Sequence, residues 1–242
     1  MSLEGKTILI TGASSGIGRA VAIESSKLGA TCILTARNEA RLQETLSAME
    51  GEGHSYIIAE QTDYAAVAAM VDSLPRLDGV SHNAGIGKTM LCSFAKMEEV
   101  ERVLRVNLTS IIHLQTLLIK RKKLNKKSSA VFMSSVAIKR RCIGKAFYGV
   151  AKAGLSAYTE NLAKEMRARG MRCNAVCPGM IETPLIGGAF AEEGYKEKDM
   201  EEHLYGRYGR PEEVAHLVAY LLSDAAEWIT GSLFDIDGGS HL

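Results

Sequence analysis

KTILITGASSGIG, residues 6–18, joins a short apolar run to three closely spaced glycines. The apolar run is typical of a buried strand, and the residues after the glycines fit one face of a helix. Gly12 permits a tight turn, whereas Gly16 and Gly18 allow close approach of another backbone and close helix–sheet packing. The start of that helix offers free N–H groups and a partial positive charge to a pyrophosphate. The stretch therefore predicts a dinucleotide-binding turn, and it lacks the Gly-Lys-Ser/Thr of a P-loop.

Short apolar runs alternate with longer helical patterns along the rest of the chain. The predicted strands cover residues 6–10, 31–36, 55–59, 79–82, 130–134, 172–176 and 232–236. The predicted helices cover the segment after Gly18, residues 39–50, 64–74, 97–122 with a break near Asn107, 147–169, and a segment that begins at Pro211. Apolar strands that alternate with helices are typical of parallel sheets with right-handed crossovers. We therefore expect an α/β fold: a doubly wound, parallel, seven-stranded sheet with helices on both faces, as a single domain over residues 1–242.

The composition excludes several classes of protein. The 242 residues include 29 Lys and Arg against 28 Asp and Glu, without the basic excess that is usual for nucleic-acid binding. The six histidines and five cysteines form no HxxxH or CxxC pattern, so no metal site is expected. The N-terminus has an early acidic residue and only a short apolar run, and no segment approaches a membrane span. We therefore expect a soluble, cytoplasmic protein.

Five further motifs follow the glycine-rich turn. They are HNAG (82–85), VNLTS (106–110), FMSS (132–135) with YGVAK (148–152), CPGMIETP (177–184) and TGSLFDIDGG (230–239). Together with TGxxxGIG, they resemble the short-chain dehydrogenase/reductase family over nearly the whole chain. His82 departs from the family's NNAG, but Asn83, Ala84 and Gly85 keep its cofactor-lining part. The resemblance implies a Rossmann fold that transfers a hydride between a nicotinamide and a carbonyl or alcohol.

Tyr148 and Lys152 are four residues apart, which places them on one face of the predicted helix. Taken alone, such a pair is typical of a tyrosine packed beneath the stem of a lysine. Reduction of a ketone builds negative charge on its oxygen, which requires a nearby proton donor. An adjacent ammonium favours the phenolate and lowers the tyrosine pKa from its usual value of about 10. We therefore predict that Tyr148 is the acid–base group and that Lys152 tunes it.

The family resemblance implies further roles at this site. Lys152 also binds the hydroxyls of the nicotinamide ribose. Ser135, thirteen residues before Tyr148, holds the substrate oxygen, and the family spacing favours it over Ser134. Asn107 bends the long helix and orders a water in a proton relay to Lys152, although a mid-helix asparagine taken alone is more often a surface residue. The implied catalytic set is Asn107, Ser135, Tyr148 and Lys152.

The same resemblance implies which residues contact the cofactor. They are Gly12, Ser14, Ser15, Gly16, Ile17, Gly18, Arg37, Glu60, Gln61, Asn83, Ala84, Gly85, Tyr148, Lys152, Pro178, Gly179, Ile181 and Thr183. Glu60 falls where the family has an aspartate that contacts adenine, with Gln61 beside it and Asp63 as a competing choice.

The end of the second strand bears on which nicotinamide cofactor binds. NAD-specific folds usually place an acid there for the ribose 2′-hydroxyl, whereas an arginine accommodates a 2′-phosphate. Here Ala36 stands in the position of the acid and Arg37 follows it. This favours NADP(H) over NAD(H), with the nearby Glu39 as a carboxylate that would repel the phosphate.

The substrate is less well defined by the sequence. We expect a substrate loop at about residues 185–207, where four residues either line a pocket or pack on the fold: Phe190, Tyr195, Leu204 and Tyr205. Residues 206–224 resemble β-ketoacyl-(acyl carrier protein) reductases, which implies a 3-oxoacyl thioester. Sugar, polyol, steroid and small-ketone dehydrogenases share this pattern and stay as alternatives.

A basic group raises the question of a partner protein. Lys126, Lys127, Arg167 and Arg169 form a possible docking patch for an acidic carrier protein. Otherwise the stretch KRKKLNKK (120–127) is typical of a solvated helix end.

Two other function classes also bind nucleotides on a glycine-rich turn. A non-catalytic dinucleotide-binding protein would be expected to lose Ser135, Tyr148 or Lys152, and a methyltransferase has no reason to keep them in order; all three are present. We therefore predict an enzyme. The resemblance also implies a homodimer or homotetramer. An apolar helical face either builds that contact or covers the sheet: Val103, Val106, Ile111 and Leu114.

Overall fold

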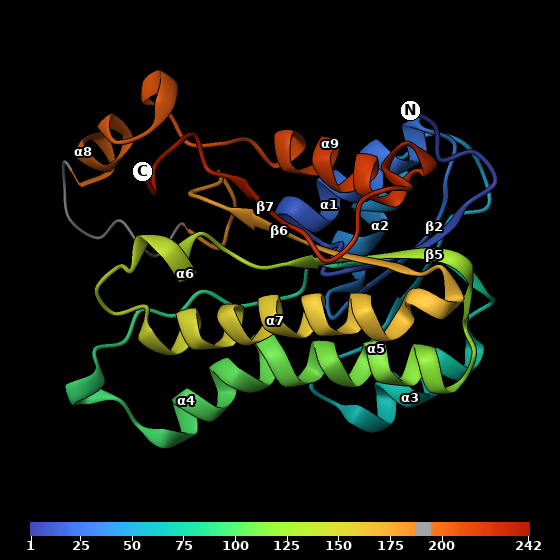
Figure 1. The fold of residues 1–242 in the computed structure, drawn as a ribbon, viewed down its shortest axis with the longest axis horizontal. Helices are drawn as coiled ribbons and strands as arrows, with labels where there is room; N and C mark the ends of the chain where they lie inside the picture. Colours follow the sequence, from blue (N-terminus) through green and yellow to red (C-terminus); the bar gives the residue numbers. More distant parts are fainter. Residues whose placement is uncertain (187–194) are drawn as a thin grey trace.

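The computed structural model describes residues 1–186 and 195–242, and one parallel sheet lies at its centre (Figure 1). Its strands are β1 (Thr7–Thr11), β2 (Thr31–Ala36), β3 (Ser55–Ile58), β4 (Leu77–His82), β5 (Leu124–Met133), β6 (Arg172–Pro178) and β7 (Leu233–Ile236). They are arranged in the order β3-β2-β1-β4-β5-β6-β7, and every neighbouring pair is parallel. The predicted doubly wound, seven-stranded α/β fold is confirmed.

Helices cover both faces of this sheet (Figure 1). One face carries α1 (Gly16–Lys27), α2 (Glu39–Ser47) and α9 (Pro211–Leu222). The other carries α3 (Tyr64–Ser73), α4 (Met97–Leu104), α5 (Ser110–Lys120) and α7 (Ala146–Glu165). In β1, Ile8 and Ile10 pack under the first layer and Leu9 under the second. Since both faces are buried, the strand reads as one continuous apolar run.

The long helix predicted over residues 97–122 is broken where expected. A π-helical turn, Arg105–Thr109, separates α4 from α5 and contains Asn107. The apolar face of this helix is largely used within the protomer, because Val103, Ile111 and Leu114 are buried. It therefore covers the sheet, which was one of the two interpretations of that face.

The sequence pattern predicted a later start for β5 than the structure shows. The strand begins at Leu124 rather than at residue 130, so only the first part of the basic stretch 120–127 is a helix end. Leu124 is buried and pairs with Leu77, and a register shift follows before Ser129 pairs with Gly79. Lysines around a single apolar anchor conceal such an irregular strand from a search for apolar runs.

Two short helices occur where no helix was predicted. They are α6 (Ala137–Arg140) and α8 (Tyr195–Glu201), the second within the predicted substrate loop at about residues 185–207. The predicted helix over 147–169 is observed as α7 followed by a 3₁₀ turn, Met166–Arg169. No helix in the described part of the chain is both long and apolar enough to span a membrane.

Candidate active site

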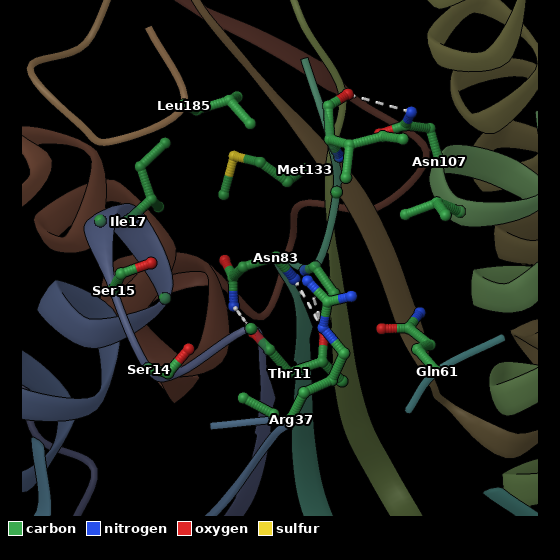
Figure 2. Close-up of a pocket in the computed structure, with 18 of the residues that line it drawn as sticks. Thr11, Ser14, Ser15, Ile17, Arg37, Gln61, Asn83, Asn107, Met133 and Leu185 are labelled. Atoms are coloured by element: carbon green, nitrogen blue, oxygen red, sulfur yellow. Dashed lines mark hydrogen bonds between the residues drawn. The ribbon is translucent and has the colours of Figure 1, made fainter. Parts of the chain in front are cut away.

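A cleft of about 880 Å³ opens at the carboxyl ends of β1 and β4, where the chain reverses its direction of travel across the sheet. Ligands in open parallel sheets bind at this switch point because neighbouring crossovers leave it on opposite sides. The cleft brings together every predicted site residue: Gly12, Ser14, Ser15, Gly16, Ile17, Gly18, Arg37, Glu60, Gln61, Asn83, Ala84, Gly85, Asn107, Ser135, Tyr148, Lys152, Pro178, Gly179, Ile181 and Thr183. Figure 2 shows Ser14 and Ser15 on one wall, Arg37 and Gln61 toward one end, and Asn107 and Leu185 toward the other.

The glycine-rich turn lies directly against the end of β4. A Cβ on Gly12, where φ is +64°, would lie 2.9 Å from Ala84 Cα, and one on Gly18 would lie 2.3 Å from the Gly12 oxygen. Only glycines permit this approach. The N-cap of α1, Ser15, makes no side-chain capping bond, so the first turn of the helix keeps free N–H groups facing the cleft. These features fit the pyrophosphate of a dinucleotide.

Asn107 joins the π-helical turn to the segment that follows β4. Its Oδ1 accepts a hydrogen bond from the Ile86 N–H at 3.0 Å, and its Nδ2 donates to the Ile86 and Val103 oxygens at 3.1 and 3.0 Å. A Cβ on Gly85 would lie 2.8 Å from Asn107 Oδ1 and 3.7 Å from Lys152 Nζ. The buried asparagine therefore fixes the wall of the cleft beside Lys152. Its part in a proton relay stays a prediction.

The two serines after β5 differ in what they contact. The Ser134 hydroxyl is buried and donates to the Lys152 main-chain oxygen at 3.1 Å, with Ser156 Oγ at 2.8 Å. Ser135 Oγ accepts from the Ala137 N–H at 3.1 Å, and Ser135 and Tyr148 both line the cleft. Ser134 thus supports α7, whereas Ser135 lines the cleft with Tyr148. The role of Ser135 at the substrate oxygen stays a prediction.

Burial dominates the electrostatics of the Tyr148–Lys152 pair. Lys152 Nζ donates to the Met133 oxygen at 2.7 Å and lies 5.6 Å from the centroid of the Tyr148 ring. Burial lowers the pKa of Lys152 to about 8. Burial also raises the pKa of Tyr148 to about 12, against an opposing effect of Ser135. The expected lowering of this pKa by Lys152 is not observed in the protein alone, where removal from water is the largest effect.

The end of the cleft near β2 carries the charges that bear on cofactor choice. Arg37 Nη1 lies 3.2 Å from Glu60 Oε2, so Glu60, rather than Glu39, is the carboxylate closest to it. Glu39 instead accepts a hydrogen bond from the Tyr56 hydroxyl at 2.9 Å. Although partial burial opposes the effect, hydrogen bonds from Thr62 and Arg37 lower the pKa of Glu60.

Two neighbouring positions complete this end of the cleft. Asp63, the competing choice for the adenine contact, caps α3 by accepting from the Ala65 and Ala66 N–H groups, both at 3.0 Å. Arg41 also lines the cleft and was missed by the sequence analysis. Arg41 lies four residues after Arg37, at the start of a predicted helix. This spacing could have indicated that both side chains lie on the same side of the chain.

The predicted substrate loop is only partly described. Leu185 lines the cleft, Phe190 lies outside the described residues, and Tyr195 begins α8. Leu204 and Tyr205 are exposed and line a separate pocket of about 200 Å³. They are therefore not part of the cleft wall.

The basic patch lies far from the cleft. Lys126 and Lys127 belong to the first half of β5, and Arg169 donates to the Leu124 oxygen at 3.0 Å, whereas Ser135 follows the other end of the strand. The patch and the cleft are thus at opposite ends of the sheet.

Comparison with known proteins places this arrangement in a family. A family model described as enoyl-(acyl carrier protein) reductase matches residues 12–241. The 3-oxoacyl-(acyl-carrier-protein) reductases of Thermotoga maritima and Vibrio cholerae are 34% and 33% identical, over 99% and 100% of this chain and 99% and 100% of their own.

Solved structures of short-chain dehydrogenases/reductases are also similar to this chain. A short-chain dehydrogenase/reductase from Serratia marcescens superposes with a TM-score of 0.89 at 28% identity, covering 100% of both chains. A dehydrogenase/reductase from Sinorhizobium meliloti gives a TM-score of 0.91 at 29% identity, covering 100% of this chain and 97% of its own. The chain belongs to the short-chain dehydrogenase/reductase family and is an oxidoreductase.

Proposed function

We propose that the protein is an NADP(H)-dependent oxidoreductase that interconverts a ketone and a secondary alcohol. The observation that carries this is the convergence of Ser135, Tyr148 and Lys152 beside the glycine-lined cradle. When bound, the nicotinamide supplies a hydride to the carbonyl carbon or accepts one from the alcohol. The side chains of the cleft hold the substrate oxygen and supply the proton.

In the direction of reduction, these side chains handle the substrate oxygen. Ser135 donates a hydrogen bond that holds this oxygen near the Tyr148 hydroxyl. As the hydride adds to carbon, the electron pair of the C=O double bond moves to oxygen, which takes the Tyr148 proton. The phenolate then regains a proton from solvent. Burial raises the pKa of Tyr148 to about 12, so the hydroxyl holds its proton at neutral pH and releases it only as negative charge develops on the substrate oxygen.

The 3-oxoacyl group is the first candidate substrate. Support comes from the relatives named 3-oxoacyl-(acyl-carrier-protein) reductase, which match over essentially the whole chain at 33–34% identity. Sugars, polyols, steroids and small ketones are the second candidates. If an acyl carrier protein docks at Lys126, Lys127, Arg167 and Arg169, it serves the cleft of another copy of the chain, because that patch and the cleft of one protomer lie at opposite ends of the sheet. This fits the predicted homo-oligomer.

The preference for NADP(H) rests on the end of the cleft near β2. Ala36 provides no carboxylate for a ribose 2′-hydroxyl, and Arg37 and Arg41 both line the cleft. Two guanidinium groups suit a 2′-phosphate, which accepts their paired N–H donors.

The test is NADPH oxidation by the protein with acetoacetyl thioesters, diketones, sugars and steroids, with Tyr148→Phe as the diagnostic variant. Phenylalanine keeps the ring and removes the proton donor, so we expect normal NADPH binding by fluorescence and a loss of at least about 100-fold in kcat. Tyr158→Phe is the control, because that tyrosine packs on Phe132 away from the cleft. Near-normal turnover by Tyr148→Phe would overturn the mechanism, and binding without turnover of any ketone by the unmodified protein would favour a non-catalytic dinucleotide-binding protein.

A further inference from the structure

Four cations lie in the short segment between Ser135 and Tyr148, and they differ in what they contact. Lys139 forms an ion pair with Asp235, and Arg140 pairs with Asp199 at 2.9 Å and with Glu202. Lys145 has no carboxylate partner among the described residues. Its Nζ instead lies 6.0 Å from the centroid of the Tyr148 ring.

The backbone holds Lys145 at this place. Lys145 is the N-cap of α7, and its oxygen accepts from the Gly149 N–H at 2.7 Å. Tyr148 follows three residues later, so the two side chains emerge on the same side of the helix. The segment just before Lys145 is pinned by a hydrogen bond of 2.8 Å from the Met90 N–H to the Gly144 oxygen.

An ammonium in this position is incompletely compensated. Lys145 is partly buried, and this burial lowers the pKa of its ammonium because a charge is less well hydrated there than in water. A partly buried charge without a partner is unfavourable, and an anion that binds there removes this cost. Lys139 and Arg140 show that this segment can pair its cations within the protein. Lys145, beside the Tyr148 ring, has no such partner among the described residues.

We propose that Lys145 binds an anionic group of the substrate, namely a carboxylate close to the carbonyl that Ser135 and Tyr148 hold. A 3-oxo acid fits, because only one methylene separates its ketone from its carboxylate, and both groups can then meet side chains of the same helical turn. This rests on the proposed reduction of a ketone but departs from the carrier-bound thioester as substrate: the free 3-oxo acid is preferred over its neutral ester or thioester.

The kinetic test compares acetoacetate with ethyl acetoacetate, which share the ketone and differ in charge. We expect Lys145→Met to lower kcat/KM for acetoacetate by about 10- to 100-fold, mainly through KM, as for one charge-assisted hydrogen bond. The value for ethyl acetoacetate should change by less than about threefold. Lys145→Arg should retain most of the preference for acetoacetate. Arg141→Met is the control, since Arg141 is an exposed cation of the same segment that forms no ion pair with any described residue, and it should affect both substrates little.

A binding measurement separates this inference from the proposed function. Titration calorimetry of the NADP⁺-loaded protein with 3-hydroxybutyrate and its methyl ester requires no turnover. Tighter binding of the acid, lost in Lys145→Met, supports the inference even if no ketone is reduced. Reduction of neutral ketones with equal binding of acid and ester leaves the proposed function intact and overturns the inference. An equal loss for both substrates in Lys145→Met also overturns it, since Lys145 would then act through Tyr148.

Discussion

Arg37 lines the cleft and forms an ion pair with a carboxylate. Its guanidinium lies 3.2 Å from Glu60, and its side chain is 73% exposed, so the pair is an exposed one that contributes little to stability. A 2′-phosphate that binds Arg37 therefore competes with Glu60 at little cost to the fold.

Arg37→Asp should weaken NADPH binding by about 10- to 100-fold, because it replaces a phosphate donor with a repelling carboxylate. NADH binding should fall much less, since NADH has a 2′-hydroxyl that an aspartate can accept from. The dissociation constants of both cofactors, measured by fluorescence titration, check this.

Glu60→Gln is the matched variant at the same ion pair. Removal of the competing charge should strengthen NADPH binding relative to NADH binding, because only NADPH carries the 2′-phosphate that Glu60 opposes. An equal loss of affinity for the two cofactors in Arg37→Asp contradicts the assignment of NADP(H).

A buried contact joins β4 and α5. His82, at the end of β4, is fully buried, stacks on Phe132 of β5 and donates from Nε2 to Gln115 Oε1 of α5 at 2.9 Å. Burial lowers the pKa of His82 to about 4. The imidazole stays neutral in the folded protein at pH values where the unfolded chain already binds a proton.

This predicts a loss of stability in mild acid. Between pH 6.5 and pH 4 the unfolded state binds more protons at His82, so the free energy of unfolding should fall as the pH falls, by about 3 kcal/mol in total. His82→Asn should flatten this dependence, as measured by urea unfolding at several pH values. His216→Asn is the control, because His216 is 64% exposed. The same slope in His82→Asn and the unmodified protein would contradict the role of His82.

The elements that the sequence pattern did not predict are held in place by contacts between residues distant in sequence. In α8, Asp199 is buried, and it accepts from Arg140 of α6 at 2.9 Å and from the Tyr208 hydroxyl at 3.0 Å. The helix is short and charged, with no apolar period to reveal it. Its partners are about 60 and 9 residues away in sequence, so only folding brings them together.

At the scale of the whole molecule, the exposed apolar side chains bear on assembly. Trp228, between α9 and β7, is 99% exposed and contacts no aromatic ring or cation of the described chain. Burial of an indole against a second copy is favourable by about 2 kcal/mol or more per side chain. The predicted homo-oligomer offers such a contact.

Trp228→Glu should therefore reduce the mass of the assembly, because a charge in an apolar interface is costly. Light scattering after size-exclusion chromatography measures this directly. Phe94→Glu is the control: Phe94 is 79% exposed, but it belongs to the segment after β4 rather than to the one beside β7. An unchanged mass for Trp228→Glu contradicts a contact at this residue.

The order of elements and the identity of the chemical groups could be predicted from the sequence. Strands buried on both faces are continuous apolar runs, as in β1, and the close approach of Gly12 and Gly18 to neighbouring backbone admits only glycine. The spacing of Ser135, Tyr148 and Lys152 places them at one site because parallel strands and the helices that follow them meet at one edge of the sheet.

Only the tertiary structure decided how the charges are compensated. Lys139 and Arg140 find carboxylates from distant segments, whereas Lys145 finds none in the described chain. Burial raises the pKa of Tyr148, whereas the spacing predicted that Lys152 would lower it, and burial lowers the pKa of Lys152. Pairing and desolvation depend on which groups folding brings within a few ångströms and which it removes from water, and neither is a property of neighbours in sequence.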